Sequence, residues 1–427
     1  MATSEERVGT AAWPARYKLV ALCVGACFVC YIDRVNISVA VLAMQEQYHW
    51  SETTKGLILS AFFFGYLALM PTSGWLANRL GGRRVLGFAV LWWSLWTLLT
   101  PPAAAISLTA LIIARVAMGM GEAATFPAIY NLYSHWVPTA ERSRAVSLLV
   151  AGIPLGTLFA LTTTGWLING YGWPVVFYLF GAIGFLWCLV WFPNSYDRPS
   201  AHPALAPEER RLLDACAPKE ATQSPVPWRQ ILSAPPVWAL IFNHFCANWV
   251  FYMLLAWLPS YFRTVLGLSI AKSGLYSAGP WLTMFLMGTA SGWLADRLIK
   301  RGADLTTVRK TMQIVGLLGA AGFMLAARDV TSPQMAFALM CGALGTLSFT
   351  WSGFLPNHLE IAPRYADVVM GLTNTAGTIP GVIGVAVTGW MVDTTGSYTS
   401  PFALAAAVNV LGAVVWFLFG TAKKVID

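Results

Sequence analysis

The sequence predicts an all-α membrane protein with twelve transmembrane helices in two six-helix halves, and three observations support this prediction. The chain has 427 residues, of which 57% are hydrophobic and only 11% are charged, against roughly 25% charged residues in a typical soluble protein. Apolar stretches close to the ~20 residues needed to cross a bilayer recur along the whole length. Residues 73–80 read SGWLANRL and residues 291–298 read SGWLADRL, an internal repeat that indicates two homologous halves.

The apolar stretches define the individual spans and the division of the chain. We predict an N-terminal half over residues 1–193, a polar, proline-rich linker over 194–235 and a C-terminal half over 236–427. Pro207 precedes the sequence EERRLL, which predicts a short linker helix beginning at Pro207. Related Gly-Trp helix ends in the second, fifth, eighth and eleventh spans indicate three-helix repeats within each half. The spans are expected at residues 18–44, 56–78, 83–103, 106–135, 141–165, 172–193, 236–262, 272–296, 308–327, 333–358, 364–391 and 398–420.

The net charge of +8 reflects membrane topology and does not indicate nucleic-acid binding. An even number of spans puts both termini on one side, and most Lys and Arg residues lie in the loops of that side. The positive-inside rule therefore places both termini in the cytoplasm. We expect a monomeric protein of the plasma membrane or an inner membrane, whose partners are the lipid bilayer and a small anion. The opposite side holds little positive charge beyond Lys55, Arg263, Lys272 and Arg328.

Ionisable residues inside spans are costly and therefore mark candidate functional positions. Asp33 and Arg34 lie in the first span, and Arg115 and Glu122 lie seven residues apart on one face of the fourth. Arg34 offers a planar cation for a substrate anion, or it only neutralises Asp33 or Glu122. Asp33 and Glu122 are the candidates for proton coupling, since carboxylates in a dry cavity exchange protons near neutral pH. Arg115 would bias Glu122 toward its charged form, or would be a structural partner of a carboxylate.

Neutral polar and aromatic side chains in the spans complete the candidate substrate site. Such groups around one arginine suit a polyhydroxylated or zwitterionic anion, although each of them could instead bond or pack between helices. His244 is expected to be a packing residue, and His358 and Glu360 are expected to belong to a gate on the cytoplasmic side. The candidate substrate-binding residues beside Arg34 are Tyr31, Tyr66, Ser348, Trp351 and Asn374.

The sequence shows no sign of a metal site or of an enzyme. Cys27 and Cys30 form a CxxC pattern inside a span, but further metal ligands are missing, so we interpret these cysteines as packing residues. The motifs HExxH and GxSxG do not occur. We expect no cofactor apart from a co-transported proton.

Two sets of motifs resemble known transporter families. The pattern G-x-x-x-(D/N)-R-x-G-x-R-R, which begins at Gly74 and has Asn78 in place of the usual Asp, resembles a signature of the major facilitator superfamily. The segments YIDRVNISVA, ARVAMGMGEAATFP, ERSRA and NHLEIAP resemble the anion:cation symporter family, the branch with sialin, vesicular glutamate transporters, plastid phosphate transporters and bacterial sugar-acid permeases. This resemblance implies the major facilitator fold and anion transport driven by protons or sodium. It also implies binding and coupling roles for Asp33, Arg34, Arg115 and Glu122.

Departures from the glutamate-type members narrow the expected substrate. Those members resemble this chain around HFCANW but carry an Arg where this chain has Ala247, and a His where it has Leu59. A second substrate carboxylate would lack a partner, so we predict a monocarboxylate such as a sugar acid, moved by proton-coupled symport with alternating access. A sodium-coupled inorganic phosphate transporter is the first alternative. An exporter or antiporter of the same fold is the second.

Overall fold

The computed structural model describes residues 13–215 and 226–426, and every regular element in these ranges is helical. Ten helical segments of the described chain are long and apolar enough to cross a membrane. Two further helices, of 31 and 22 residues, complete the twelve crossings, so the predicted fold class is confirmed. The helices are α1 Ala15–Tyr48, α2 Glu52–Leu80, α3 Gly82–Ile106, α4 Leu108–Glu122, α5 Thr125–Trp136, α6 Thr139–Tyr171, α7 Trp173–Asn194, α8 Pro207–Ala215, α9 Trp228–Ser233, α10 Pro235–Thr264, α11 Ile270–Lys300, α12 Leu305–Ala326, α13 Pro333–Leu347, α14 Thr350–Ile361, α15 Ala366–Thr395 and α16 Thr399–Phe419, with a 3₁₀ turn at Pro199–Ala201.

Two of the predicted spans are each built from two helices. The fourth span consists of α4 and α5, which are separated at Ala123 and Ala124. Pro127 explains this break, because proline lacks the N–H of a helical hydrogen bond and its ring would clash with the carbonyl of Ala123. The tenth span consists of α13 and α14, separated at Ser348 and Phe349. The fourth and tenth spans hold equivalent places in the two halves, so the break recurs with the internal repeat.

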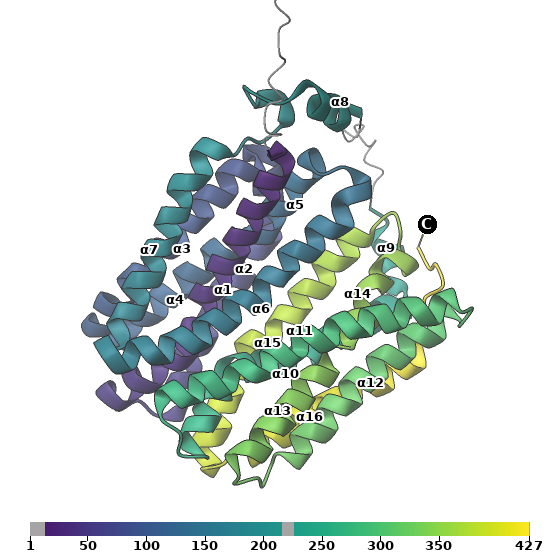
Figure 1. Ribbon diagram of the computed structural model, residues 1–427. Coiled ribbons are helices and arrows are strands. Elements are labelled where there is room, and N and C mark those ends of the chain that lie inside the picture. Colours follow the sequence, from purple (N-terminus) through teal and green to yellow (C-terminus); the bar gives the residue numbers. More distant parts are fainter. Residues whose placement is uncertain (1–12, 216–225, 427) are drawn as a thin grey trace, which may run out of the picture.

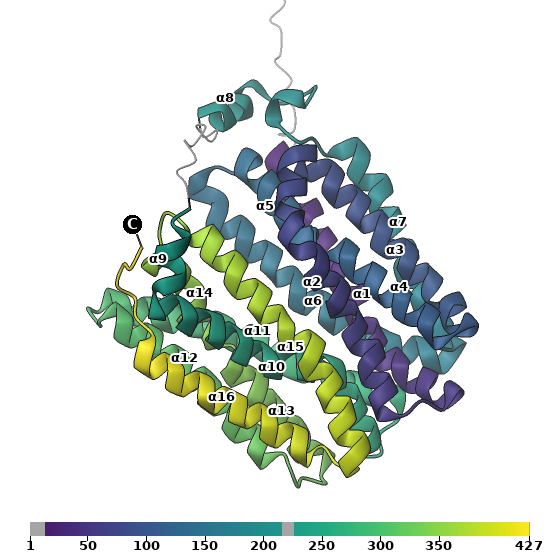
Figure 2. The same cartoon turned by 180° about the vertical axis from the view of Figure 1, so that it is seen from behind.

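Helices α1–α7 and α10–α16 form two groups that lie side by side (Figures 1 and 2). Helix α2 packs against α15, α6 against α11, and α1 against α10. α1 begins and α16 ends on the same side of the bundle, which we call the terminus side. The helix groups meet at the opposite side and spread apart toward the terminus side (Figure 1). The division of the chain at residues 193 and 236 remains a prediction.

Polar contacts and a close backbone approach join the two groups at the side opposite the termini. Thr53 Oγ1 donates a hydrogen bond to Asp393 Oδ2 at 2.6 Å, and Arg263 Nη2 pairs with Glu46 Oε1 at 2.8 Å. A Cβ atom on Gly56 in α2 would lie only 3.2 Å from the Cα atom of Gly389 in α15. Glycine at both positions therefore allows α2 and α15 to approach closely at this end.

The linker contains the short helix that the sequence predicts. α8 begins at Pro207, as expected, whereas α9 was not predicted. The Glu209 carboxylate accepts hydrogen bonds from the backbone N–H groups of Ala15 and Arg16, both at 3.0 Å, and also pairs with the Arg16 guanidinium at 3.1 Å. These contacts attach α8 to the first turn of α1, where the orphan N–H groups and the positive helix end favour a carboxylate.

Candidate functional site

A buried ion pair between α1 and α4 forms the centre of the candidate site. Arg34 Nε and Nη2 both lie 2.9 Å from Glu122 Oε2. Arg34 is 7% exposed and Glu122 is fully buried. The second carboxylate oxygen, Oε1, has no hydrogen-bond partner within the described residues. Asp33 and Glu122 were the two predicted partners of Arg34. In the structure the partner is Glu122, the last residue of α4 before the helix break.

Three aromatic rings surround the Arg34 guanidinium. Its central carbon lies 4.7 Å from the ring centroid of Tyr31 and 5.0 Å from those of Phe62 and Tyr66. Arg34 Nη1 also donates to the Tyr31 hydroxyl at 3.4 Å. A cation over aromatic faces is stabilised by the ring quadrupoles, more strongly where water is excluded. The structure thus brings the predicted residues Tyr31 and Tyr66 to Arg34, and it adds Phe62.

Asp33 faces a different neighbour from Arg34. Its Oδ2 atom accepts a hydrogen bond from Trp93 Nε1 in α3 at 3.1 Å, and the residue is fully buried. Oδ1 lacks a hydrogen-bond partner in the described part of the chain. An ionised carboxylate is costly to bury without full hydrogen bonding, and binding a proton removes that charge. The geometry therefore suits proton uptake at Asp33.

Arg115 takes a different partner from the one expected. Its Nη1 atom lies 3.0 Å from the sulfur of Met118, and its guanidinium carbon lies 5.5 Å from the Phe62 ring centroid. Arg115 Nε has no hydrogen-bond partner among the described residues. The Glu122 carboxylate is paired with Arg34 instead. Arg115 therefore contributes positive charge to the cavity beside Arg34 without a direct ion pair to Glu122.

Arg34 and Arg115 line a small cavity between the two helix groups. Its volume is about 20 Å³, and Leu255 and Ala256 in α10 close it from the C-terminal group. A cavity needs roughly 10–15 Å³ to hold one water molecule. The site in this conformation has room for a water molecule but not for an organic anion, so substrate entry requires the helices to move apart.

The three predicted site residues of the C-terminal group, Ser348, Trp351 and Asn374, do not line this cavity. Ser348 and Trp351 lie at the break between α13 and α14, where a Cβ atom on Gly288 of α11 would be 3.4 and 2.9 Å from them. Ser348 Oγ donates to the carbonyl of Gly345 in its own helix at 2.7 Å. Asn374 is half-buried in α15, and its carbonyl accepts a hydrogen bond from Thr378. Their substrate contacts remain a prediction.

Several residues at the site were not found by the sequence reasoning. Cys30 Sγ donates to Glu122 Oε2 at 3.1 Å, although we had interpreted this cysteine as a packing residue. Its spacing of four residues from Arg34 places both on one helix face, and this signal was present in the sequence. Nothing in the sequence indicated that Trp93 would bind Asp33. Tyr252 of α10 packs against Phe63 with ring centroids 4.6 Å apart, and it brings a hydroxyl group from the other helix group.

His244, His358 and the ion pair of Arg309 with Glu360 lie in the C-terminal group. His244 packs against Phe354 with ring centroids 4.8 Å apart, as expected for a packing residue. His358 Nε2 lies 2.8 Å from the Thr373 hydroxyl. Glu360 pairs with Arg309 at 2.7 Å near the terminus side. A gating role for His358 and Glu360 remains a prediction.

The comparisons with known proteins agree with this architecture. Residues 23–385 match the family model described as Major Facilitator Superfamily. The chain is 46% identical over 416 residues to the chloroplastic sodium-dependent phosphate transport protein 1 of Arabidopsis thaliana, covering 97% of this chain and 81% of the relative. It is 44% identical to the chloroplastic ascorbate transporter of Arabidopsis thaliana, with coverage of 97% and 76%. It is 35% identical to sialin of Homo sapiens, with coverage of 95% and 89%.

Solved structures show the same fold at low sequence identity. A bacterial homolog of the human lysosomal transporter Spinster superposes with a TM-score of 0.78 at 18% identity, covering 96% of this chain and 97% of the other. A D-xylose–proton symporter superposes with a TM-score of 0.77 at 16% identity, with coverage of 96% and 99%.

Proposed function

Because the chain belongs to the anion:cation symporter branch of the Major Facilitator Superfamily, we propose that it moves a small organic anion by proton-coupled symport. It is a multi-pass membrane transporter and not an enzyme, and its relatives are anion transporters. The substrate we propose is a monocarboxylate such as a sugar acid. Alternating access of the two helix groups would expose the site to each side in turn.

The buried pair of Arg34 and Glu122 is the observation that carries this proposal. An incoming carboxylate can bind the Arg34 guanidinium only in competition with Glu122 Oε2, which already occupies it at 2.9 Å. Glu122 displaced from Arg34 would be an unpaired buried charge, which costs several kcal/mol. Uptake of a proton by Glu122 removes this cost. Binding of the anion and binding of the proton therefore favour each other.

The charge balance of the cavity supports symport of one monoanion with one proton. Asp33 and Glu122 carry two negative charges, and Arg34 and Arg115 carry two positive charges, so the buried set is neutral when all four are ionised. Addition of one monoanion together with one proton keeps it neutral. A dianion would need a second proton or a further cation, and residue 247, where glutamate-type relatives carry an Arg, is a buried alanine. This favours a singly charged substrate.

The relatives support two substrate classes. The ascorbate transporter carries, by its name, a sugar-derived acid that is singly charged at neutral pH, which agrees with a sugar-acid substrate. The relative at 46% identity is named for sodium-dependent phosphate transport, so sodium-coupled phosphate transport is the second candidate.

The coupling ion can be tested with purified protein in proteoliposomes. Labelled gluconate and labelled inorganic phosphate are offered under an imposed pH gradient without sodium, and under a sodium gradient at equal pH. We expect the pH gradient alone to drive gluconate accumulation. Accumulation of phosphate that depends on sodium, without gluconate uptake, would establish the second candidate instead.

We also propose that the terminus side faces the cytoplasm, because its loops hold most of the positive charge. Site-specific labelling of a single cysteine introduced at Asp304, in the exposed loop before α12, tests this orientation. A membrane-impermeant reagent added to intact cells should not reach it.

A further inference from the structure

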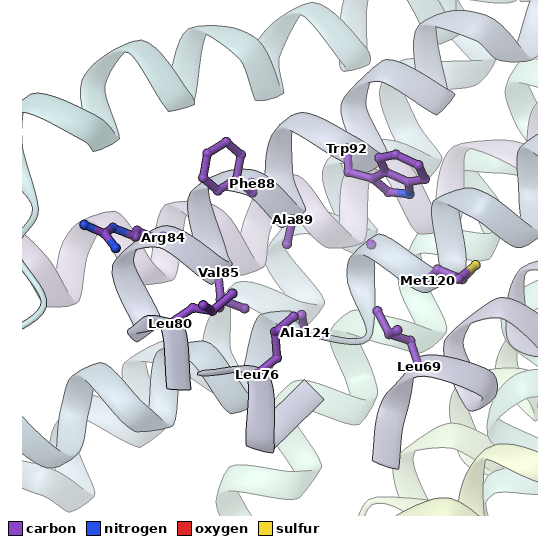
Figure 3. A pocket seen from close by; sticks show the side chains of 11 residues that line it. Leu69, Leu76, Leu80, Arg84, Val85, Phe88, Ala89, Trp92, Met120 and Ala124 are labelled. Carbon is purple, nitrogen blue, oxygen red and sulfur yellow. The ribbon is translucent and has the colours of Figure 1, made fainter. Parts of the chain in front are cut away.

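An apolar groove on the outer surface of the N-terminal group has one charged residue at its end. The groove has a volume of about 390 Å³ and lies between α2, α3 and the break that follows α4 (Figure 3). Arg84 lies at one end, and Trp92 and Met120 lie at the other (Figure 3). Phe88 and Trp92 are 63% and 45% exposed, so the groove opens toward the surrounding membrane rather than the bundle interior.

The length of the groove matches one leaflet of a bilayer. Arg84 and Trp92 are eight residues apart on α3, which corresponds to about 12 Å at 1.5 Å per residue. Leu69 and Leu80 on α2 are eleven residues apart, which corresponds to about 16 Å. The hydrocarbon core of a bilayer is ~30 Å thick, so one leaflet contributes about 15 Å. The groove can therefore hold an acyl chain from the interface to the centre of the bilayer.

The charge at the end of the groove favours an anionic headgroup. Arg79, Arg83 and Arg84 gather where α2 ends and α3 begins, at the terminus side. Arg83 donates to the carbonyl of Phe192 at 2.6 Å, and Arg79 lies over the Trp75 ring at 5.1 Å. Arg84 is exposed and lines the groove itself. A guanidinium at this depth suits bidentate binding of a phosphate group.

We propose that this groove binds an anionic phospholipid from the leaflet on the terminus side. One acyl chain lies along α2 and α3, and the headgroup phosphate binds Arg84. Basic residues at the membrane surface attract anionic lipids in this way.

A second apolar cavity provides an internal comparison. It has a volume of about 520 Å³, and its lining includes Leu275, Phe337 and the neutral polar residues Gln334 and Tyr276, but no Lys or Arg. An acyl chain in that cavity should show no preference for the charge of the headgroup.

The test uses full-length purified protein in detergent with two photoactivatable lipids, phosphatidylglycerol and phosphatidylcholine, each with a diazirine on one acyl chain. Crosslinked peptides are quantified by mass spectrometry. We expect phosphatidylglycerol to label α2 and α3 peptides about fivefold more than phosphatidylcholine, the equivalent of ~1 kcal/mol for one arginine near the headgroup. The cavity lined by Leu275 and Phe337 should be labelled equally by both lipids. Equal labelling of the groove by both lipids would overturn the proposal.

Variants distinguish the contribution of the Arg84 charge to lipid binding from the contribution of the apolar groove. Arg84→Gln should reduce phosphatidylglycerol labelling to the phosphatidylcholine level, whereas the matched control Arg79→Gln should retain most of the preference. Ala89→Phe fills the groove and should reduce labelling by both lipids, with size-exclusion chromatography confirming a folded protein. Arg84 lies at the end of the groove away from Met120 and the break that follows Glu122 (Figure 3), so substrate binding should persist in Arg84→Gln. An undiminished preference in folded Arg84→Gln, or displacement of the lipid by inorganic phosphate alone, would contradict the proposal.

Discussion

The fourth and tenth spans are broken at equivalent places, but their chemistry differs. In the N-terminal group, the break between α4 and α5 follows Glu122, whose carboxylate forms a buried ion pair with Arg34. In the C-terminal group, the break between α13 and α14 carries Ser348, whose hydroxyl is bonded to its own helix. The C-terminal ion pair of Arg309 and Glu360 is partly exposed near the terminus side.

This difference is consistent with separate tasks for the two helix groups. Polar contacts within the C-terminal group join neutral side chains, such as Gln313 to Asn243 at 3.0 Å and His358 to Thr373 at 2.8 Å. Such contacts hold helices together in a membrane without burying charge. The N-terminal group instead encloses four ionisable residues at the interface between the groups. We infer that anion binding and proton coupling reside in the N-terminal group, and that the C-terminal group supplies a neutral wall that moves.

The largest expected effect comes from removal of the Arg34 guanidinium. Arg34→Ala should weaken substrate binding by at least roughly 30-fold, because truncation of one partner of a buried charge pair costs about 2–5 kcal/mol. Arg34→Lys keeps the charge but loses the planar fork, so binding should also fall strongly. Thermal-shift titration of the purified protein with gluconate measures the affinity.

A double variant separates folding from binding at this pair. Arg34→Leu combined with Glu122→Leu removes both charges, so the protein should be folded and near wild-type in thermal stability while binding remains absent. Substrate affinity that is unchanged in Arg34→Ala would refute the assignment of Arg34 as the anion anchor.

The second largest effect concerns coupling. Glu122→Gln mimics the protonated state, so the pH gradient should no longer drive accumulation, while exchange of labelled for unlabelled substrate should persist. Asp33→Asn is tested in the same two assays. Ser38→Ala is the matched control, because Ser38 lines the same cavity but is neutral and bonded to its own helix. If Glu122→Gln still concentrates substrate against a gradient, Glu122 is not the coupling residue.

A third prediction adds a cation to the C-terminal group. Ala247→Arg should raise the affinity for dicarboxylates relative to monocarboxylates, since a second carboxylate left unpaired in the unmodified site costs several kcal/mol. Ala247→Leu adds volume without charge and is the control. Competition of unlabelled succinate against labelled gluconate measures the ratio. Tight binding of a dicarboxylate by the unmodified protein would show that a second cation, with Arg115 the first candidate, already serves this role.

The sequence was sufficient to predict the fold and the members of the charged cluster, but not how they pair. Composition, span length and the SGWL repeat predict twelve helices because membrane crossing requires long apolar segments. Asp33 and Arg34 are adjacent, so their side chains point about 100° apart on the helix. Which of them faces α4 depends on the rotation of α1 against its neighbours, and hydropathy does not report this rotation.

Lys55, at the side opposite the termini, is a second residue whose contacts the sequence does not predict. Its position in a loop region suggested a surface charge, but the structure buries it completely. Its ammonium pairs with Glu52 at 2.6 Å and lies 5.0 Å from the Trp257 ring centroid in α10. Trp257 belongs to the other helix group and is more than 200 residues away from Lys55 along the chain. A sequence pattern that reads one helix at a time cannot show this contact.

The smallest expected effect tests whether the C-terminal group is free of a coupling residue. His244 in α10 packs against Phe354 and so close to Gly377 that a Cβ atom there would lie 2.5 Å from its Cδ2 atom. His244→Phe should therefore change gradient-driven accumulation by less than about threefold, the equivalent of under ~1 kcal/mol. Gly377→Ala should lower thermal stability by overpacking, and the added variant His244→Ala should restore it by making room. Loss of accumulation in His244→Phe with exchange intact would show instead that a titrating group of the C-terminal group takes part in coupling, and the division of tasks between the halves would be wrong.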